Sequence, residues 1–575
     1  MLSVGARRRQ EDARDSERIR VSSRTSGWPS VVCFCTLLVL GLTTIMARAQ
    51  GQSGEAPAAA AERLISQAHE LLQAGRLEEA EPLLARAVKL DPSAQAIRLE
   101  WASVLDRLHR YKEAEVALEG VAPPAPTSQR VAYYRLKASI NFGAGNAKSA
   151  AHDMERALRL APDDQNLKLA TGMAEIEAQN WTEAISHLAP VFAATHSPAA
   201  GLALLQAQLA AHRDCEATLK ELRSLDLPAG PKLQFEVQLG ELLSQGGMEG
   251  EAVREFEEAA KTAPDQADLY FNLALAQFRG GQLDPALESA QKAKALGDSA
   301  SVESLIGDIQ EARADSLSAV HSYQAAVALD PNQESYRLTL GLELLRHGTF
   351  EPALAVFQQA SAIFPNSSRV RVAVGLTHYF LEQYPEAIQA LLEAAQIDPS
   401  SELAPEYLGE IQLQQPVTPV PAAIDLVCRY ADQHPDRAGM LAYCGALQLR
   451  VEHDRGDAGP SVKVMERLRL AARRAPSDAT ARCALGQALG WSRQWQQAEA
   501  EMEECLRLNP NSVEGHYRMA GIARHLGQTQ RAEKEVKLHD QAQQHLVESN
   551  ALRDQTLQKF LYTMNGADSK SPSAP

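Results

Sequence analysis

The chain has 575 residues, enough for several domains or for one long repeat array. Apolar residues make up 45% of it and aromatic residues only 5%, a balance that favours closely packed helices over a sheet-based core. The net charge is −16, and the first 49 residues hold eight arginines and four acidic residues, a net of +4. The remainder therefore carries −16 − 4 = −20. Such a surface repels phosphate backbones, which excludes nucleic acid as the expected partner.

Residues 1–49 have the pattern of an export signal. Seven arginines up to Arg24 precede an apolar run from Val31 to Met46, and Ala47-Arg48-Ala49 then supplies a small-x-small cleavage pattern. The run is 16 residues long, shorter than the roughly 20 that span a membrane, which favours cleavage. An uncleaved N-terminal membrane anchor remains the alternative. In both cases the rest of the chain is expected outside the cytoplasm, periplasmic or secreted, after a flexible linker at residues 50–60.

Five cysteines follow this segment: Cys215, Cys428, Cys444, Cys483 and Cys505. In an oxidising compartment some of them could pair, but their number is odd and their spacings match no small disulfide scaffold. We therefore expect them to fill small buried positions between helices.

Prolines recur along the chain with a period near 34 residues. Those placed to end a helix pair are Pro92, Pro126, Pro162, Pro264, Pro331, Pro365, Pro399, Pro435, Pro476 and Pro510. A fixed period of this length indicates stacked supersecondary units, because one short unit cannot bury its own apolar face.

The segments that end at these prolines share a residue pattern. The segment from Glu334 has small or apolar residues at fixed places, namely Gly341, Leu344, Ala353, Phe357 and Ala360 before Pro365. The segment from Leu233 has Gly240, Leu243, Ala252, Phe256 and Ala259 before Pro264. This pattern resembles that of the tetratricopeptide-repeat family. The resemblance implies two antiparallel helices per unit, with small residues at positions 8 and 20 for close helix approach. A large residue at position 24 is expected to fill the gap to the next unit.

The fold implied by this resemblance is all-α, a right-handed superhelical solenoid of helix-turn-helix units. About fourteen units are expected over residues 61–540, some of them degenerate. Residues 541–564 are expected to form an amphipathic C-terminal capping helix, and residues 565–575 a disordered tail.

No motif for catalysis or metal binding stands out. His-Glu-x-x-His and Cys-x-x-Cys are absent, and His539 and His545 are six residues apart, which does not place them on one helix face. The repeats leave no room for a catalytic domain. We therefore expect no enzymatic activity, no cofactor and no metal.

In the family that the sequence resembles, the first helix of each unit lines a concave groove through positions 2, 5, 9, 12 and 13. The residues at those positions in three central units that we assign to a protein-binding groove are Phe271, Phe278, Arg279, Leu338, Leu342, Arg346, Arg369, Tyr379 and Phe380. Large apolar side chains on an exposed face mark a binding site. Alternatively, some of these rings belong to the core between neighbouring helices.

The sequence thus predicts a non-catalytic scaffold of the cell envelope that binds a peptide segment or a protein subunit in its groove. An accessory subunit of a secretion machine, or of one for polysaccharide export or assembly, is the alternative. The membrane is expected to be contacted only by the N-terminal segment, if that segment stays uncleaved.

Overall fold

The computed structural model describes residues 57–414, 418–548, 556–558, 560, 561 and 564. These residues form helices and connecting turns, with no strand among them. The chain divides into two compact units between Asn180 and Trp181. The predicted export signal and most of the predicted linker, as well as the C-terminal tail beyond Met564, lie outside the described residues.

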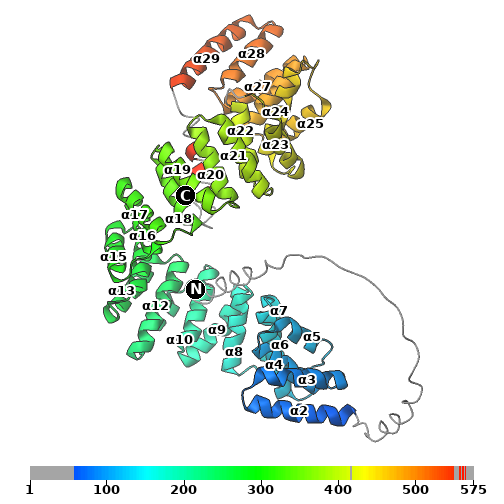
Figure 1. Cartoon of the computed structure of the whole chain (residues 1–575), viewed down its shortest axis with the longest axis vertical. Coiled ribbons are helices and arrows are strands. Elements are labelled where there is room, and N and C mark those ends of the chain that lie inside the picture. The colour runs from blue at the N-terminus through cyan, green and yellow to red at the C-terminus, as the bar shows by residue number, and fades with distance from the viewer. Residues whose placement is uncertain (1–56, 415–417, 549–555, 559, 562–563, 565–575) are drawn as a thin grey trace, which may run out of the picture. The chain divides into compact units, whose positions relative to one another are not determined.

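The first unit consists of helices joined by short turns (Figure 1). Their bounds are α2 (Pro57–Gln73), α3 (Leu77–Leu90), α4 (Gln95–Arg107), α5 (Tyr111–Leu118), α6 (Thr127–Gly143), α7 (Ala147–Leu160) and α8 (Gln165–Glu177). Each helix packs against the next one in the chain. The apolar interior of the first unit is built largely from alanine and leucine, as the low aromatic content predicts.

The second unit continues the same arrangement. Its helices are α9 (Trp181–Thr195), α10 (Pro198–Ala210), α11 (Glu216–Arg223), α12 (Ala229–Gln245), α13 (Glu249–Thr262), α14 (Ala267–Arg279), α15 (Leu283–Leu296), α16 (Ala300–Ala312), α17 (Ser316–Leu329), α18 (Glu334–Arg346), α19 (Phe350–Ile363), α20 (Ser368–Phe380), α21 (Tyr384–Ile397), α22 (Leu403–Gln414), α23 (Pro421–Gln433), α24 (Ala438–Asp454), α25 (Val462–Arg474), α26 (Ala479–Trp491), α27 (Trp495–Leu508), α28 (Val513–His525) and α29 (Thr529–Glu548). Alternate helices also touch, for example α22 with α24 and α24 with α26. The predicted all-α repeat solenoid is confirmed.

The turn inside most helix pairs contains one residue with positive φ. Gly348, between α18 and α19, has φ of 69°, and its N–H donates to the Leu345 carbonyl at 2.9 Å. This left-handed conformation costs glycine little, which explains the glycines at several such turns. Other turns use non-glycine residues, such as Arg493 with φ of 59°.

Close packing within several pairs depends on a glycine in the first helix that faces a large side chain in the second. A Cβ on Gly341 of α18 would lie 2.3 Å from Cε1 of Phe357 in α19, and one on Gly307 would lie 2.5 Å from Cε1 of Tyr323. The large residue at position 24 was expected to fill the gap to the next unit. It packs on the glycine of its own unit and also shares a buried cluster with the next unit, as Tyr323 does with Leu340.

The cysteines depart from the prediction. Disulfides join Cys428 to Cys444 and Cys483 to Cys505, each with a Cα–Cα distance of 4.9 Å. Cys215 is buried and free. The expectation that cysteines only fill buried space is therefore wrong for four of the five. The pairing follows from helix packing, because each disulfide bridges two consecutive antiparallel helices, a distance that sequence spacing alone does not reveal.

The expected capping helix at residues 541–564 also needs correction. Helix α29 runs from Thr529 to Glu548 and packs on α28, so the boundary at 541 lies inside a helix. The described residues from Thr556 to Met564 are helical and are buried against helices α20 and α22, about 150 to 200 residues earlier in the chain. They therefore do not cap the end of the array.

No helix among the described residues is long and apolar enough to cross a membrane.

Candidate protein-binding groove

The predicted groove residues fall into three groups. Phe271 and Phe278 of α14 are half-buried, and Arg279 at its end is exposed. Leu338 and Leu342 of α18 are buried, with 2% and 5% of their surfaces exposed. The two leucines of α18 are therefore not freely available to a partner. The two phenylalanines of α14 are partly accessible.

The rings at the end of α20 are buried as well. Phe380 stacks on Phe350 of α19 with ring centroids 5.6 Å apart, and Tyr379 meets Phe380 edge-on at 5.4 Å. Both belong to one continuous hydrophobic cluster that also contains Phe560, Leu561 and Met564 from the C-terminal segment. The predicted aromatic residues thus form part of a core that the end of the chain completes.

The described residues of the C-terminal segment, 556–558, 560, 561 and 564, lie against α20 and α22, a surface that we call the groove over α20 and α22. Phe560, Leu561 and Met564 are at most 4% exposed. With the partly buried Leu557 they are spaced i, i+3, i+4 and i+7, which is one face of a helix. In Figure 1 the red C-terminal residues lie beside α20. The segment therefore binds in the manner of an amphipathic helix in a groove.

Three contacts fix the position and direction of this segment. The Thr556 hydroxyl donates a hydrogen bond to the buried carboxylate of Glu410 in α22. The Phe560 ring meets Tyr407 of α22 edge-on, with centroids 6.2 Å apart. At the other end, the Arg369 guanidinium of α20 donates to the Met564 carbonyl oxygen at 3.3 Å. The segment accordingly runs from α22 towards α20, opposite to the order of these helices in the chain.

Among the nine predicted groove residues, Arg369 donates a hydrogen bond to a backbone carbonyl of the chain's own C-terminal segment. Sequence reasoning missed Glu410 and Tyr407. Glu410 lies 34 residues after Leu376, at position 9 of the next unit, so extending the same register by one repeat would have found it. The apolar spacing from Leu557 to Met564 was also readable. The site where this segment docks could not be predicted, because the sequence does not show against which surface a helix packs.

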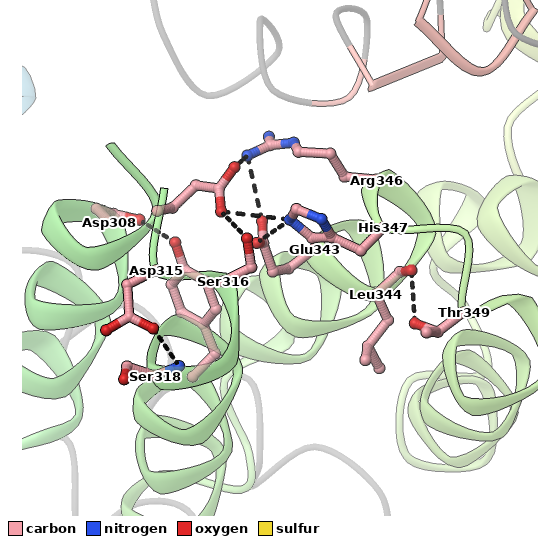
Figure 2. Close-up of polar contacts among 11 residues, drawn as sticks. Asp308, Asp315, Ser316, Ser318, Glu343, Leu344, Arg346, His347 and Thr349 are labelled. Carbon is pink, nitrogen blue, oxygen red and sulfur yellow. Dashed lines mark hydrogen bonds and ion pairs between the residues drawn. The ribbon is translucent and has the colours of Figure 1, made fainter. Parts of the chain in front are cut away.

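A second polar site lies between α16 and α18. Figure 2 shows Glu343 and Arg346 of α18, and His347 directly after it, with their contacts converging. Arg346 Nη1 lies 2.8 Å from Glu311 Oε1 and 3.2 Å from Glu343 Oε2. His347 Nε2 lies 2.9 Å from Glu343 Oε1. Glu311, Glu343 and His347 could together ligate a metal ion, but the guanidinium already supplies the positive charge these carboxylates need. The group is an ion-pair network.

The two carboxylates of this network titrate far apart. Burial, and then the hydrogen bond with Glu311, raise the pKa of Glu343 to about 7, whereas the hydrogen bond with Glu343 and the Arg346 guanidinium lower the pKa of Glu311 to about 2. They share one proton, as close carboxylates do. Nearby, burial raises the pKa of Asp308 to about 6, opposed by a hydrogen bond of 2.8 Å from the Tyr323 hydroxyl.

We expect the second unit to lose stability as the pH rises from about 4 to 7. The folded protein raises the pKa values of Glu343 and Asp308 above their ordinary values near 4. The protonated carboxyls therefore contribute fully to the free energy of unfolding below about pH 4, and this contribution is lost as each one deprotonates in the folded state. In the Glu343→Gln variant, the free energy of unfolding should fall over this pH range by less than in the wild type, by a difference on the order of 2 kcal/mol. Urea unfolding at several pH values measures the slope. A variant with the same slope as the wild type would show that Glu343 titrates normally.

The fold defines a class of protein, the α-helical repeat proteins. Family models described as "Tetratricopeptide repeat" match residues 71–140 and, with a second model, residues 136–195, 241–301 and 338–402. The chain belongs to the tetratricopeptide-repeat family. No curated protein sequence matches it.

Solved structures similar to this chain include two that cover a third of it and one that covers most of it. The MamA protein is 20% identical with a TM-score of 0.27, and covers 33% of this chain and 100% of its own. Yeast Tom70 is 15% identical with a TM-score of 0.29, and covers 87% of this chain and 99% of its own. YrrB, described as a tetratricopeptide-repeat protein with an unusual peptide-binding site, is 22% identical with a TM-score of 0.27, and covers 33% and 97%.

Proposed function

We propose that this chain is a non-catalytic protein-interaction scaffold whose groove over α20 and α22 binds an amphipathic helical segment of a partner protein. The observation that carries the proposal is the docked segment at residues 556–564, in which Phe560, Leu561 and Met564 are buried. A groove that accepts this helix has the shape and the polar groups to accept another of the same pattern.

The contacts of this segment describe the partner. Apolar side chains spaced i, i+3, i+4 and i+7 fill the groove, which supplies most of the binding free energy because burying each one is worth about 1.5–3 kcal/mol. Glu410 accepts a hydrogen bond at one end, and Arg369 donates one to a backbone carbonyl at the other. A partner helix needs a hydroxyl or a cationic group opposite Glu410.

In this proposal the C-terminal segment competes with the partner for the groove. Seven residues separate Glu548, where α29 ends, from Thr556, so the segment is held at a high effective concentration near its site, of about millimolar order. A partner then has to displace the segment before it can bind. The occupied groove therefore lowers the apparent affinity for the partner.

The test compares the full-length chain with a chain that ends at Glu548. The probe is a fluorescein-labelled synthetic peptide with the sequence of residues 553–566, measured by fluorescence polarisation. We expect the shortened chain to bind it at least about tenfold more tightly than the full-length chain, because its groove is empty. The matched control is the same peptide with Phe560→Ala and Leu561→Ala, which should bind neither chain.

A second variant protects the test against misfolding of the shortened chain. Full-length protein with Phe560→Ala and Leu561→Ala keeps every residue of the groove and should bind the unmodified peptide as the shortened chain does. Arg369→Ala and Glu410→Gln in that background should weaken binding. If both open-groove proteins keep their helical spectrum and bind no peptide, the segment is a fixed part of the fold and the proposal fails.

We further propose that the scaffold acts outside the cytoplasm, in the cell envelope. The support comes from the apolar run at 31–46 after an arginine-rich stretch, and from the two disulfides, which persist in oxidising compartments. N-terminal sequencing of the protein from its native cells tests this: a start at Gln50 indicates cleavage, and an intact N-terminus in the membrane fraction indicates an anchor. An intact N-terminus in a cytoplasmic fraction would contradict the placement.

A further inference from the structure

A cavity of about 260 Å³ lies between α26 and α28, away from the groove over α20 and α22. The end of α24 and the start of α27 close its sides, contributing His453 and Trp495. Twelve residues line it: His453, Gly486, Gln487, Gly490, Trp491, Trp495, Tyr517, Arg518, Gly521, Ile522, Arg524 and His525. None of them contributes to the docking of the C-terminal segment described above.

Aromatic side chains dominate the wall of this cavity. Trp495 and His525 stack with centroids 4.0 Å apart and planes at 11°, and His453 meets Trp491 edge-on at 5.2 Å. Tyr517 is 60% exposed at the rim. The whole chain contains only five tryptophans, and two of them lie here. Aromatic residues gathered around a hollow, with one of them largely exposed, are a common feature of binding surfaces.

Two glycines leave the hollow open. A Cβ on Gly521 would meet no atom within 4 Å, and one on Gly490 would meet nothing closer than 3.8 Å. Gly341, by contrast, is needed because a ring presses against it. Glycine inside a helix destabilises it relative to alanine, and at Gly521 no packing contact requires one. The space that its side chain would fill belongs to the cavity.

The charge of the cavity is opposite to that of the chain. Its lining has two arginines and two histidines but no aspartate or glutamate, while the chain as a whole carries −16. Arg518 is paired with Glu514 at 2.7 Å, which partly neutralises it. Arg524 is exposed, and no ion pair is recorded for it within the described residues. An anionic group at the rim therefore meets a favourable potential.

We propose that this cavity binds a peptide segment that presents one aromatic side chain next to a carboxylate. The ring enters between Trp491 and Tyr517 over Gly521, and the carboxylate pairs with Arg524. The site is independent of the groove over α20 and α22, so either can fail without the other.

The size and chemistry of the cavity argue against two other ligand classes. Pockets that enclose a whole small molecule measure about 300–1,000 Å³, so 260 Å³ suits one bulky side chain better than a whole nucleotide. A neutral sugar needs several hydrogen-bond acceptors, and Gln487 is the only side-chain amide or carboxylate in the lining.

The test uses the full-length chain and a fluorescein-labelled peptide of about six residues with one phenylalanine between two aspartates. Binding is measured by polarisation, and independently, with the unlabelled peptide, by the change in tryptophan fluorescence expected from Trp491 and Trp495. Control peptides replace phenylalanine by alanine or both aspartates by lysine. We expect only the original peptide to bind, with each replacement weakening affinity by about tenfold or more.

Variants of the protein locate the site. Gly521→Leu fills the cavity without a clash at Cβ, and Arg524→Glu reverses the charge at the rim, so each should weaken binding by about tenfold. The matched control is Gly439→Leu near the start of α24, where a Cβ also meets nothing and binding should be unchanged. If Gly521→Leu does not fold, Tyr517→Ala replaces it. Binding that none of these variants changes, equal binding of the lysine peptide, or tighter binding of a mononucleotide or a neutral oligosaccharide would overturn the proposal.

Discussion

Replacing Phe357 with alanine lowers the free energy of unfolding of the second unit by about 3–5 kcal/mol. The Phe357 side chain is fully buried in α19, and its ring fills the space that Gly341 of α18 leaves empty. Its removal loses apolar burial and leaves a cavity that two antiparallel helices cannot close without breaking their contacts to neighbouring units. Urea unfolding followed by far-ultraviolet circular dichroism measures the loss. Hydrogen exchange in α18 and α19 shows whether it is local, because repeat arrays do not always unfold in one step.

The control for this prediction is Leu317→Ala in α17. Leu317 is 72% exposed, so its loss should change the free energy of unfolding by no more than about 0.5 kcal/mol. If Phe357→Ala and Leu317→Ala unfold at the same urea concentration, the ring does not hold the helix pair together.

Gly341 gives the same prediction a second, stricter form. Gly341→Ala alone should destabilise the protein, since the new Cβ would lie 2.3 Å from the Phe357 ring, although alanine favours a helix by about 1 kcal/mol. In the Phe357→Ala background the clash is gone, so Gly341→Ala should stabilise. This change of sign between backgrounds measures the coupling of the two residues directly. Additive effects would show that they do not touch.

The helix pairs could be predicted from the sequence because each unit repeats the same local pattern. Glycine or alanine at position 8, a large residue at position 24 and a proline after the second helix specify a pair wherever they occur together. The residue that position 24 contacts could not be derived so directly. Phe357 shares a buried cluster with Val370 of the next unit and also presses on Gly341 of its own unit, and the residue pattern alone does not show the second contact.

The groove was predicted less well, for a different physical reason. The positions of Arg369, Tyr379 and Phe380 follow from the register. Arg369 contacts the C-terminal segment, whereas the two rings share only the large hydrophobic cluster with it. That the segment reaches Arg369 depends on a contact between residues nearly 200 apart, which no local pattern encodes. The apolar face from Leu557 to Met564 indicates that this segment packs against another part of the protein. Packing on the last repeat, as a capping helix, is the interpretation that involves only nearby residues.

The disulfides show the same limit at shorter range. Cys428 and Cys444 are 16 residues apart, and Cys483 and Cys505 are 22 apart. Neither spacing is distinctive, because what brings each pair together is the antiparallel packing of two consecutive helices. With the helix bounds known, the pairing follows; without them, burial as free thiols is an equally good interpretation.

Reducing both disulfides should lower the stability of the second unit by about 2–4 kcal/mol for each bond. Each bond closes a loop in the unfolded chain and so lowers the conformational entropy of that state. Each bond also joins two helices that contribute to the continuous hydrophobic cluster, for example through Val427 and Met502. Thermal unfolding with and without a reductant measures the effect. The control is a chain with Cys428, Cys444, Cys483 and Cys505 all replaced by alanine, whose unfolding temperature should not respond to the reductant.

The same bonds connect the fold to the proposed location. After denaturation without reductant, mass spectrometry of protein purified from native cells should find Cys215 alkylated and the four paired cysteines protected. Alkylation of all five would mean that the chain folds with free thiols, in which case the disulfides give no support for an oxidising compartment. Protection of four requires that the chain met an oxidising environment while α23, α24, α26 and α27 were already packed. The bonds join helices that approach each other only in the folded array, so their presence would mean that the packed helices, and not only the unfolded chain, met an oxidising compartment.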